Sequence, residues 1–134
     1  MRRRVGAARV GRLATVTADR APHLVPVCFE FCGDDIVSVV DAKPKSTTAL
    51  QRLANVRANP TVTLLVDYYD DRDWSQLWWV RVDGRARVIE GGDAYRRAVD
   101  VLIAKYEQYR ADPPRGAVLA ITPTTWRAWS GGRA

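Results

Sequence analysis

Apolar and polar side chains alternate along several stretches of this chain, as they do in β-strands that bury one face. In segment 22–31 the apolar residues Val25, Val27, Phe29 and Phe31 follow one another at intervals of two. Together with the frequent β-branched and aromatic residues, this pattern predicts six strands. They cover residues 13–17, 22–31, 36–40, 61–69, 77–88 and 117–129.

The longest alternating strand, over residues 77–88, separates two faces of different character. One face is apolar and carries Trp78, Val80, Val82, Ala86 and Val88. The other face carries Trp79, Arg81, Arg85 and Arg87. An indole beside a guanidinium on that polar face either lines a ligand site or stacks in solvent.

The second predicted strand, over residues 22–31, contains two prolines and the first of two cysteines. Pro22 and Pro26 cannot donate ladder hydrogen bonds, so we expect this strand to bulge or to lie at an edge of the sheet. Cys28 and Cys32 are four residues apart, about 13 Å along a strand, which is too far for a disulfide. We expect buried thiols, as in a reducing compartment.

Two segments show helical rather than strand periodicity. Residues 46–57 place Leu50, Leu53 and Ala54 on one face. Residues 93–110 form a strongly amphipathic pattern. The apolar positions of the second helix are Tyr95, Ala98, Val99, Leu102, Tyr106 and Tyr109. Many strands with two interspersed helices predict an α+β domain built around an antiparallel barrel.

The segment that enters the first of these helices is basic. Lys43 and Lys45 precede the hydroxyl residues Ser46, Thr47 and Thr48. A helix N-terminus carries roughly half a positive charge, so lysines there are unfavourable unless an anion is bound. Free backbone N–H groups, hydroxyls and ammonium groups together suit a phosphate or carboxylate. The alternative is a solvated loop in which Ser46 or Thr47 caps the helix.

Length and charge narrow the class of protein. The chain has 134 residues, about one domain, and a formal charge of +6 that comes mostly from arginine. The arginines are scattered, and no zinc-finger, RRM or basic-zipper signature appears, so we expect no nucleic-acid partner. No apolar run approaches the ~20 residues of a membrane span, and the Met-Arg-Arg-Arg start lacks the apolar stretch of a secretory signal. We therefore expect a cytoplasmic protein with no membrane partner.

The usual catalytic and nucleotide-binding motifs are missing from the sequence. His23 is the only histidine, which argues against a metal cluster or a Ser-His-Asp triad. Neither the Rossmann glycine pattern nor the P-loop pattern occurs. If the protein is an enzyme, we expect a cofactor to supply the reactivity.

Several segments, taken in order, resemble a known family. They are LATV, PHLVPVCFEF, VDAKPKSTTALQRLANVRANP, LLVDYYDD, LWWVRVDGRARV and AITPTTW. They resemble the pyridoxamine 5'-phosphate oxidase-like proteins, and within them the branch of probable coenzyme F-420-dependent oxidoreductases, where F-420 is a 5-deazaflavin. The resemblance implies an antiparallel six-stranded split β-barrel with flanking helices. It also implies a homodimer that binds a flavin or deazaflavin in a cleft between its subunits.

The resemblance assigns cofactor-binding roles to residues of this chain. The matches are a strand whose backbone borders the tricyclic ring (Val25, Pro26 and Val27), a facing strand end (Val39, Val40 and Asp41), a phosphate-binding loop (Lys43, Lys45, Ser46 and Thr47) and a strand that closes the pocket (Trp79 and Arg81). The third of these is the segment in which the helix dipole already predicts an anion site. No metal site and no side-chain nucleophile are expected.

One departure from the family pattern bears on the cofactor. True pyridoxamine phosphate oxidases carry arginine and lysine at the ends of the strand that matches residues 23–28, and these grip the phosphate of flavin mononucleotide. This chain has His23 and Cys28 there. The departure favours F-420, whose oligoglutamate tail suits an arginine-rich surface.

The resemblance thus implies an oxidoreductase that transfers hydride from reduced F-420 to a small unsaturated or conjugated substrate. Two alternatives stay open. The first is a flavin mononucleotide enzyme of the same fold, and the second is a carrier that binds F-420 without turnover. Heme binding has little support, because His23 is the one imidazole available as an axial ligand.

Overall fold

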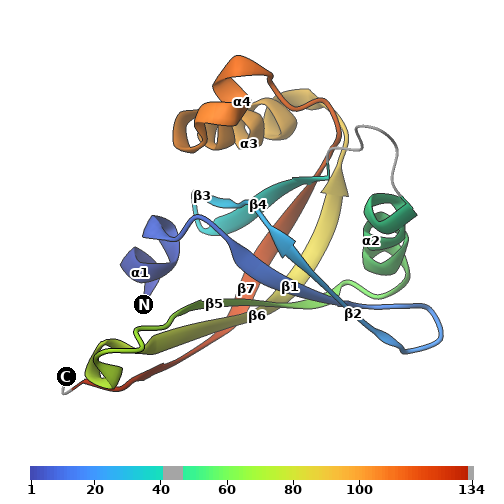
Figure 1. Cartoon of the computed structure of the whole chain (residues 1–134). Coiled ribbons are helices and arrows are strands. Elements are labelled where there is room, and N and C mark those ends of the chain that lie inside the picture. The colour runs from blue at the N-terminus through green and yellow to red at the C-terminus, as the bar shows by residue number, and fades with distance from the viewer. Residues whose placement is uncertain (41–46, 133–134) are drawn as a thin grey trace.

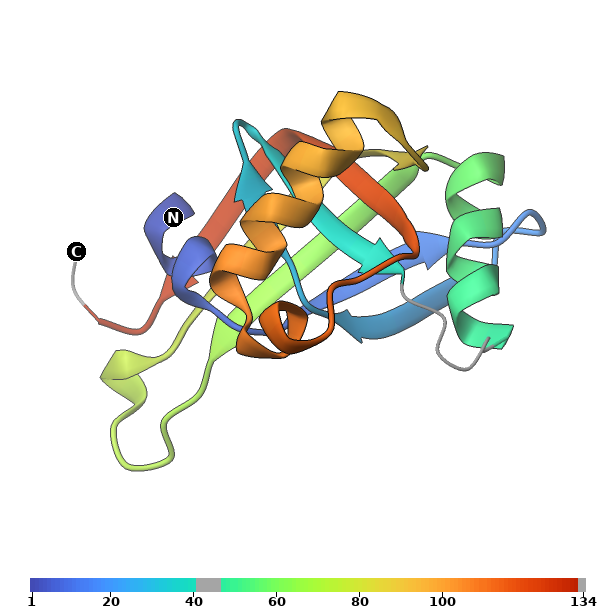
Figure 2. The same ribbon diagram turned by 90° about the horizontal axis from the view of Figure 1, so that it is seen from above.

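The backbone forms a strongly twisted antiparallel sheet with helices around it (Figures 1 and 2). The computed structural model describes residues 1–40 and 47–132, with the backbone alone at 47–49. In that part of the chain, seven strands follow the order β2-β1-β5-β6-β7-β4-β3 across the sheet. They are β1 (Gly11–Val16), β2 (Pro22–Val27), β3 (Glu30–Cys32), β4 (Asp35–Val40), β5 (Thr61–Tyr68), β6 (Trp78–Ile89) and β7 (Ala117–Ser130).

The helices lie outside the sheet. Helices α3 and α4 cover one side, α2 lies at one end, and α1 lies at the opposite end (Figure 1). Their bounds are α1 (Arg2–Ala7), α2 (Thr47–Ala58), α3 (Gly92–Lys105) and α4 (Glu107–Ala111), with a 3-10 turn η1 (Trp74–Gln76) between β5 and β6. The α+β class and the antiparallel sheet are confirmed. None of the described helices is long and apolar enough to cross a membrane.

The prediction of six strands was wrong, because the segment 22–31 is divided between two strands. Strand β2 lies at one edge of the sheet and β3 at the other, so the chain crosses between the edges at residues 28–29. The crossing is tied down by hydrogen bonds outside the ladder: the Ser38 hydroxyl donates to the Cys28 carbonyl at 2.7 Å, and the Phe29 N–H donates to the Tyr106 hydroxyl at 2.9 Å. The expected edge position of the proline-containing strand is confirmed, since β2 pairs with β1 alone.

The two longest strands, β6 and β7, pair along their whole length and join the two halves of the sheet. Their register shifts by one residue between Asp83 and Gly84. A Cβ atom at Gly84 would lie 2.6 Å from the Thr122 carbonyl oxygen, closer than any side chain tolerates. Glycine therefore allows the two backbones to approach where the sheet bends.

The core has two parts. The main cluster fills the interior of the sheet, with Leu13, Phe29, Leu64 and Val82 among its fully buried members. The second cluster lies beneath α3. It comprises Val37, Val39, Ala98, Leu102, Val118 and Ala120, and all six apolar positions predicted for this helical region belong to it or pack against it.

The helix predicted over residues 93–110 breaks at Tyr106 into α3 and α4. Tyr106 has an extended backbone, with φ −111° and ψ 120°. Its hydroxyl accepts from the Phe29 N–H and lies 2.9 Å from the carbonyl oxygens of both Phe29 and Arg9. These contacts place the tyrosine over the crossing between β2 and β3, and the helix ends there.

The buried face of α2 differs from the predicted one. Leu50 is 53% exposed and Ala54 is also exposed, whereas Asn55 and Val56 are buried. Asn55 Nδ2 donates to Thr15 Oγ1 on β1 at 3.0 Å. The helix therefore packs through a polar contact as well as Val56 and Leu53, which apolar periodicity could not indicate.

Candidate functional site

A cavity rich in aromatic side chains lies where β5, β6 and β7 approach the β5–β6 hairpin. Its volume is about 400 Å³, within the size range of small-molecule sites. Trp79 on β6 is in register with Asp67 on β5 and Trp129 on β7, so their side chains share one face of the sheet. The cavity is lined by Leu65, Asp67, Tyr68, Tyr69, Leu77, Trp78, Trp79, Arg81 and Trp129.

Arg81 lies on the same face two residues from Trp79, and its neighbours hold it in place. Its Nε lies 3.5 Å from Asp83 Oδ1, and the Thr63 hydroxyl donates to that same oxygen at 2.9 Å. The Nε atom is buried and makes no hydrogen bond, while the side chain as a whole is 41% exposed. The exposed part of the guanidinium can therefore bind a ligand in the cavity.

A second hollow of about 580 Å³ lies between α1, β1 and the hairpin. It shares Asp67, Tyr68 and Trp78 with the aromatic cavity, so the two hollows adjoin. Arginine dominates its other lining residues, which include Arg3, Arg4, Arg9 and Arg12. Only one acidic residue, Asp67, belongs to this described lining, and it pairs with Arg12 at 3.4 Å.

Two of the three residues predicted to border a cofactor ring have side chains that pack into the core. Val27 is 6% exposed and belongs to the main core, and Val25 packs against that core. Pro26 alone of the three has an exposed side chain. Because β2 has a strand partner on one side only, the backbone along its other edge is available to a ligand.

The predicted facing strand end is also buried. Val39 lies in the cluster beneath α3, and Val40 lies in the main core. Asp41, Lys43, Lys45 and Ser46 lie outside the described residues. The backbone of Thr47 begins α2, so the predicted helix start agrees with the structure to within one residue.

Two of the predicted parts of the site, the start of α2 and the strand with Trp79 and Arg81, lie apart in the molecule. Figures 1 and 2 show the start of α2 at one end and the β5–β6 hairpin at the other. Arg85 pairs with Thr61, just after α2, and Trp79 lies six residues further toward the hairpin, or about 20 Å along the strand. In one chain, the hairpin end of β6 that carries Trp79 therefore lies away from α2.

The crossing at residues 28–29 contains two titratable groups that sequence reasoning did not connect. Lys105 Nζ donates to the Phe29 carbonyl at 2.9 Å and lies 4.2 Å from the centre of the Phe29 ring. Burial lowers the pKa of Lys105, and burial raises the pKa of Tyr106 to about 12. The partners are more than 70 residues apart in sequence, so no local pattern could pair them.

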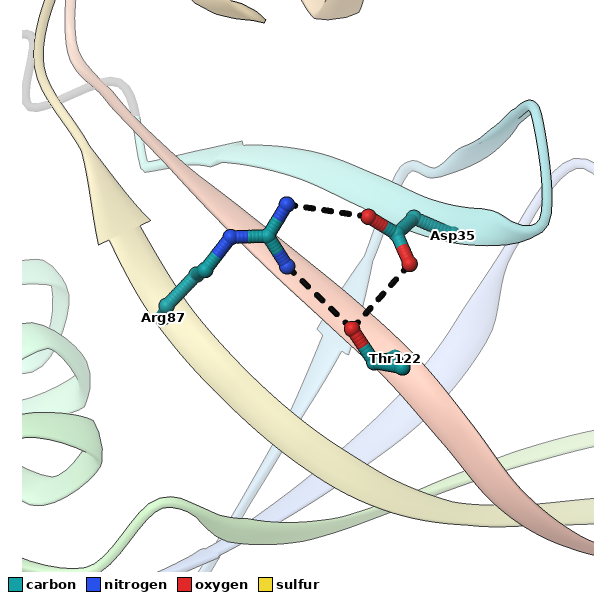
Figure 3. Close-up of polar contacts among 3 residues, drawn as sticks. All are labelled: Asp35, Arg87 and Thr122. Carbon is teal, nitrogen blue, oxygen red and sulfur yellow. Dashed lines mark hydrogen bonds and ion pairs between the residues drawn. The ribbon is translucent and has the colours of Figure 1, made fainter.

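His23 and the two cysteines are half-buried, so the expectation of buried thiols was wrong, whereas the expected absence of a bond between Cys28 and Cys32 agrees with two free thiols. A separate polar cluster lies near the turn into β4 (Figure 3). The Arg87 guanidinium donates to Asp35 at 3.0 Å and to Thr122 at 3.2 Å, and the Thr122 hydroxyl donates to Asp35 at 3.1 Å. These hydrogen bonds connect β4, β6 and β7, so we interpret the cluster as a structural contact that stabilises the sheet.

Comparison with known proteins identifies the family. Residues 1–130 match the sequence family described as pyridoxamine 5'-phosphate oxidase. The chain belongs to this family. It is 33% identical over 87 residues to a 5a,11a-dehydrotetracycline/5a,11a-dehydrooxytetracycline reductase from Streptomyces rimosus. That match covers 65% of this chain and 60% of the reductase, so the chain spans less than two-thirds of its relative.

Solved structures share the fold of this family member at low sequence identity. The conserved hypothetical protein Rv2991 from Mycobacterium tuberculosis superposes with a TM-score of 0.78 at 22% identity, over 97% of this chain and 82% of that one. The heme storage protein HutZ from Vibrio cholerae gives 0.71 at 13% identity, over 92% and 87%. These likenesses confirm the predicted split-barrel type of fold.

Proposed function

We propose that this protein is a cytoplasmic, homodimeric oxidoreductase that uses coenzyme F-420 to reduce a small unsaturated or conjugated substrate. The observation that carries the proposal is the aromatic cavity around Trp79 and Arg81 in a chain of the pyridoxamine 5'-phosphate oxidase family. Its described lining contains no histidine or cysteine, which suits a reaction whose reactivity comes from a bound cofactor. The similarity to a dehydrotetracycline reductase supports reduction of a conjugated molecule.

The cofactor would be held by residues from two copies of the chain. One copy supplies the backbone of Val25, Pro26 and Val27, the strand end at Val39, Val40 and Asp41, and the phosphate-binding segment of Lys43, Lys45, Ser46 and Thr47. The other copy supplies Trp79 and Arg81, which close the pocket over the bound cofactor and face the substrate. The separation of these groups within one chain supports this division.

The described residues fit a deazaflavin. The free edge of β2 offers backbone N–H and carbonyl groups of the kind that pair with the polar edge of such a ring. His23 and Cys28 replace the cationic residues that would grip flavin mononucleotide, and the Cys28 carbonyl already accepts a bond from Ser38. The arginine-lined hollow beside α1 suits an oligoglutamate tail.

Reduced F-420 supplies a hydride for two-electron reduction. The chain's own residues bind and orient the reactants in the aromatic cavity. Solvent, or at most a nearby polar group, delivers the accompanying proton, and no side chain acts as a nucleophile.

Parallel calorimetric titrations of the purified protein with F-420 and with flavin mononucleotide test the cofactor. We expect tighter binding of F-420. Turnover is tested separately by following the oxidation of reduced F-420 when a dehydrotetracycline is added. Binding without turnover of any conjugated acceptor would favour the carrier alternative, and tighter binding of flavin mononucleotide would favour the flavin enzyme.

A further inference from the structure

The aromatic cavity has the shape and chemistry of a site for a flat molecule. Three tryptophans and two tyrosines contribute to its lining, and several of them are markedly exposed: Trp129 is 45% exposed and Tyr69 is 60% exposed. Clustered exposed aromatic side chains mark a binding surface rather than an ordinary part of the protein surface. Their faces favour stacking against a planar conjugated ring.

The charges around the cavity favour an anion. Asp67, the acidic residue in the described lining, pairs with Arg12 at 3.4 Å. Arg81 also belongs to the lining, and Arg127 is its register partner on β7, so two guanidinium groups share this face of the sheet with Asp83. One positive charge therefore remains beside the aromatic surface.

Arg81 has an ion-pair partner on one side before any ligand arrives. Asp83 lies at its Nε, and the Thr63 hydroxyl in turn holds Asp83. A guanidinium contacted on its Nε side keeps its terminal nitrogens for an incoming oxygen, and the entropy of ordering the side chain is already partly lost in the free protein.

We propose that this cavity is the substrate site and that its substrate is a planar conjugated molecule bearing a carboxylate or enolate oxygen, which Arg81 binds while Trp79 and Trp129 contact the ring. That the bound molecule is a substrate rests on the proposed function. The binding preference itself is a property of the chain without any cofactor.

The test compares two ligands with the same ring. 2-Naphthoate carries a carboxylate, and 2-naphthalenemethanol replaces it with a neutral group. Calorimetric titration of the cofactor-free protein is expected to show about tenfold tighter binding of the naphthoate, because one charge-assisted hydrogen bond is gained. The preference should disappear in Arg81→Gln, and both ligands should weaken in Trp129→Ala.

Arg85→Gln is the matched control. Arg85 lies on the same strand and face as Arg81, about 13 Å away, and is exposed and absent from the cavity lining. It should keep the tenfold preference. An equal loss of preference in Arg85→Gln and Arg81→Gln would show a general charge effect and overturn the proposal.

Two further results would overturn it. Binding of naphthoate that weakens as the protein concentration rises would show that a second copy covers the cavity. Competition between naphthoate and F-420 for one site would assign the cavity to the cofactor ring rather than the substrate. Failure of F-420 to bind, by contrast, would overturn the cofactor assignment and leave the naphthoate preference intact.

Discussion

At the scale of single residues, the contacts around a side chain decide its role more than its type does. Arg81 and Arg87 lie on the same face of β6. Arg87 is engaged by both Asp35 and Thr122, whereas Arg81 has Asp83 at its Nε alone and lines a cavity. Of these two arginines, Arg81 is the one that presents its guanidinium to a cavity.

Lys45→Ala tests the phosphate-binding segment. Loss of one charge-assisted hydrogen bond to the cofactor phosphate should weaken F-420 binding about ten- to hundredfold. The melting temperature of the apo protein should stay constant or rise slightly, since a cation near the positive end of a helix is removed. Calorimetric titration and thermal melting on the same sample measure both quantities.

Arg57→Ala is the control for Lys45, because it removes a cation from the last turn of the same helix. It should leave the affinity unchanged. Wild-type affinity in Lys45→Ala would refute the anion site at that residue.

Tyr106→Phe should lower the free energy of unfolding by about 1–3 kcal/mol, because the Phe29 N–H loses its acceptor in a half-buried place. Burial raises the pKa of Tyr106 to about 12, above its value near 10 in the unfolded chain. The unfolded state therefore releases its proton first, and stability falls as pH rises from about 10 to 12. Thermal melting across that range should show a shallower fall in Tyr106→Phe, and equal slopes would contradict the assignment.

At the scale of elements, alternation predicted most strands because each buries one face against the core. It placed Trp79 and Arg81 together correctly, since residues two apart in a strand share a face. The break of segment 22–31 was missed, because Phe29 keeps the alternating pattern while its N–H bonds to Tyr106. The neighbours of Trp79 and Arg81, namely Trp129, Asp83 and Thr63, were missed too. Most of them lie on other strands, and the pattern of one segment does not indicate its register with another.

The same limit explains the error on α2. Its buried face depends on Asn55 bonding to Thr15, forty residues away in sequence, so apolar spacing within the helix indicated the wrong side. For the second helical region the apolar face was predicted correctly, because its apolar positions pack against one core cluster, whereas the break at Tyr106 was missed.

Gly84→Ala tests the close approach of β6 and β7. The added Cβ would meet the Thr122 carbonyl oxygen at 2.6 Å and the Ile121 side chain at 2.8 Å, so we expect a loss of about 1–3 kcal/mol in the free energy of unfolding. Gly91→Ala serves as the control, because no atom lies within 4 Å of its added Cβ. Denaturant melts of the two variants should differ clearly, and equal midpoints would contradict the account of the bend.

At the scale of the whole molecule, the sheet sets the distance between the two ends of the proposed cofactor site. The start of α2 and the hairpin lie at opposite ends of the molecule, which supports the proposal that two copies complete one site (Figure 1). Sedimentation at micromolar concentration should therefore give about twice the chain mass. A monomer that binds F-420 would contradict this arrangement.

Mixed dimers test the sharing of the site between copies. Lys45→Ala and Trp79→Ala should each weaken F-420 binding when present in both subunits. Unfolding and refolding the two variants together should produce hybrid dimers in which one of the two sites carries neither change. Tight binding should reappear at about a quarter of the sites in an equal mixture, and no recovery would place all the binding residues on one subunit.

The proposed use of F-420 is tested most directly by calorimetric titration of the purified wild-type protein with F-420, run beside an identical titration with flavin mononucleotide. We expect one F-420 bound per chain and weaker binding of flavin mononucleotide. Absence of F-420 binding, or tighter binding of flavin mononucleotide, would contradict it.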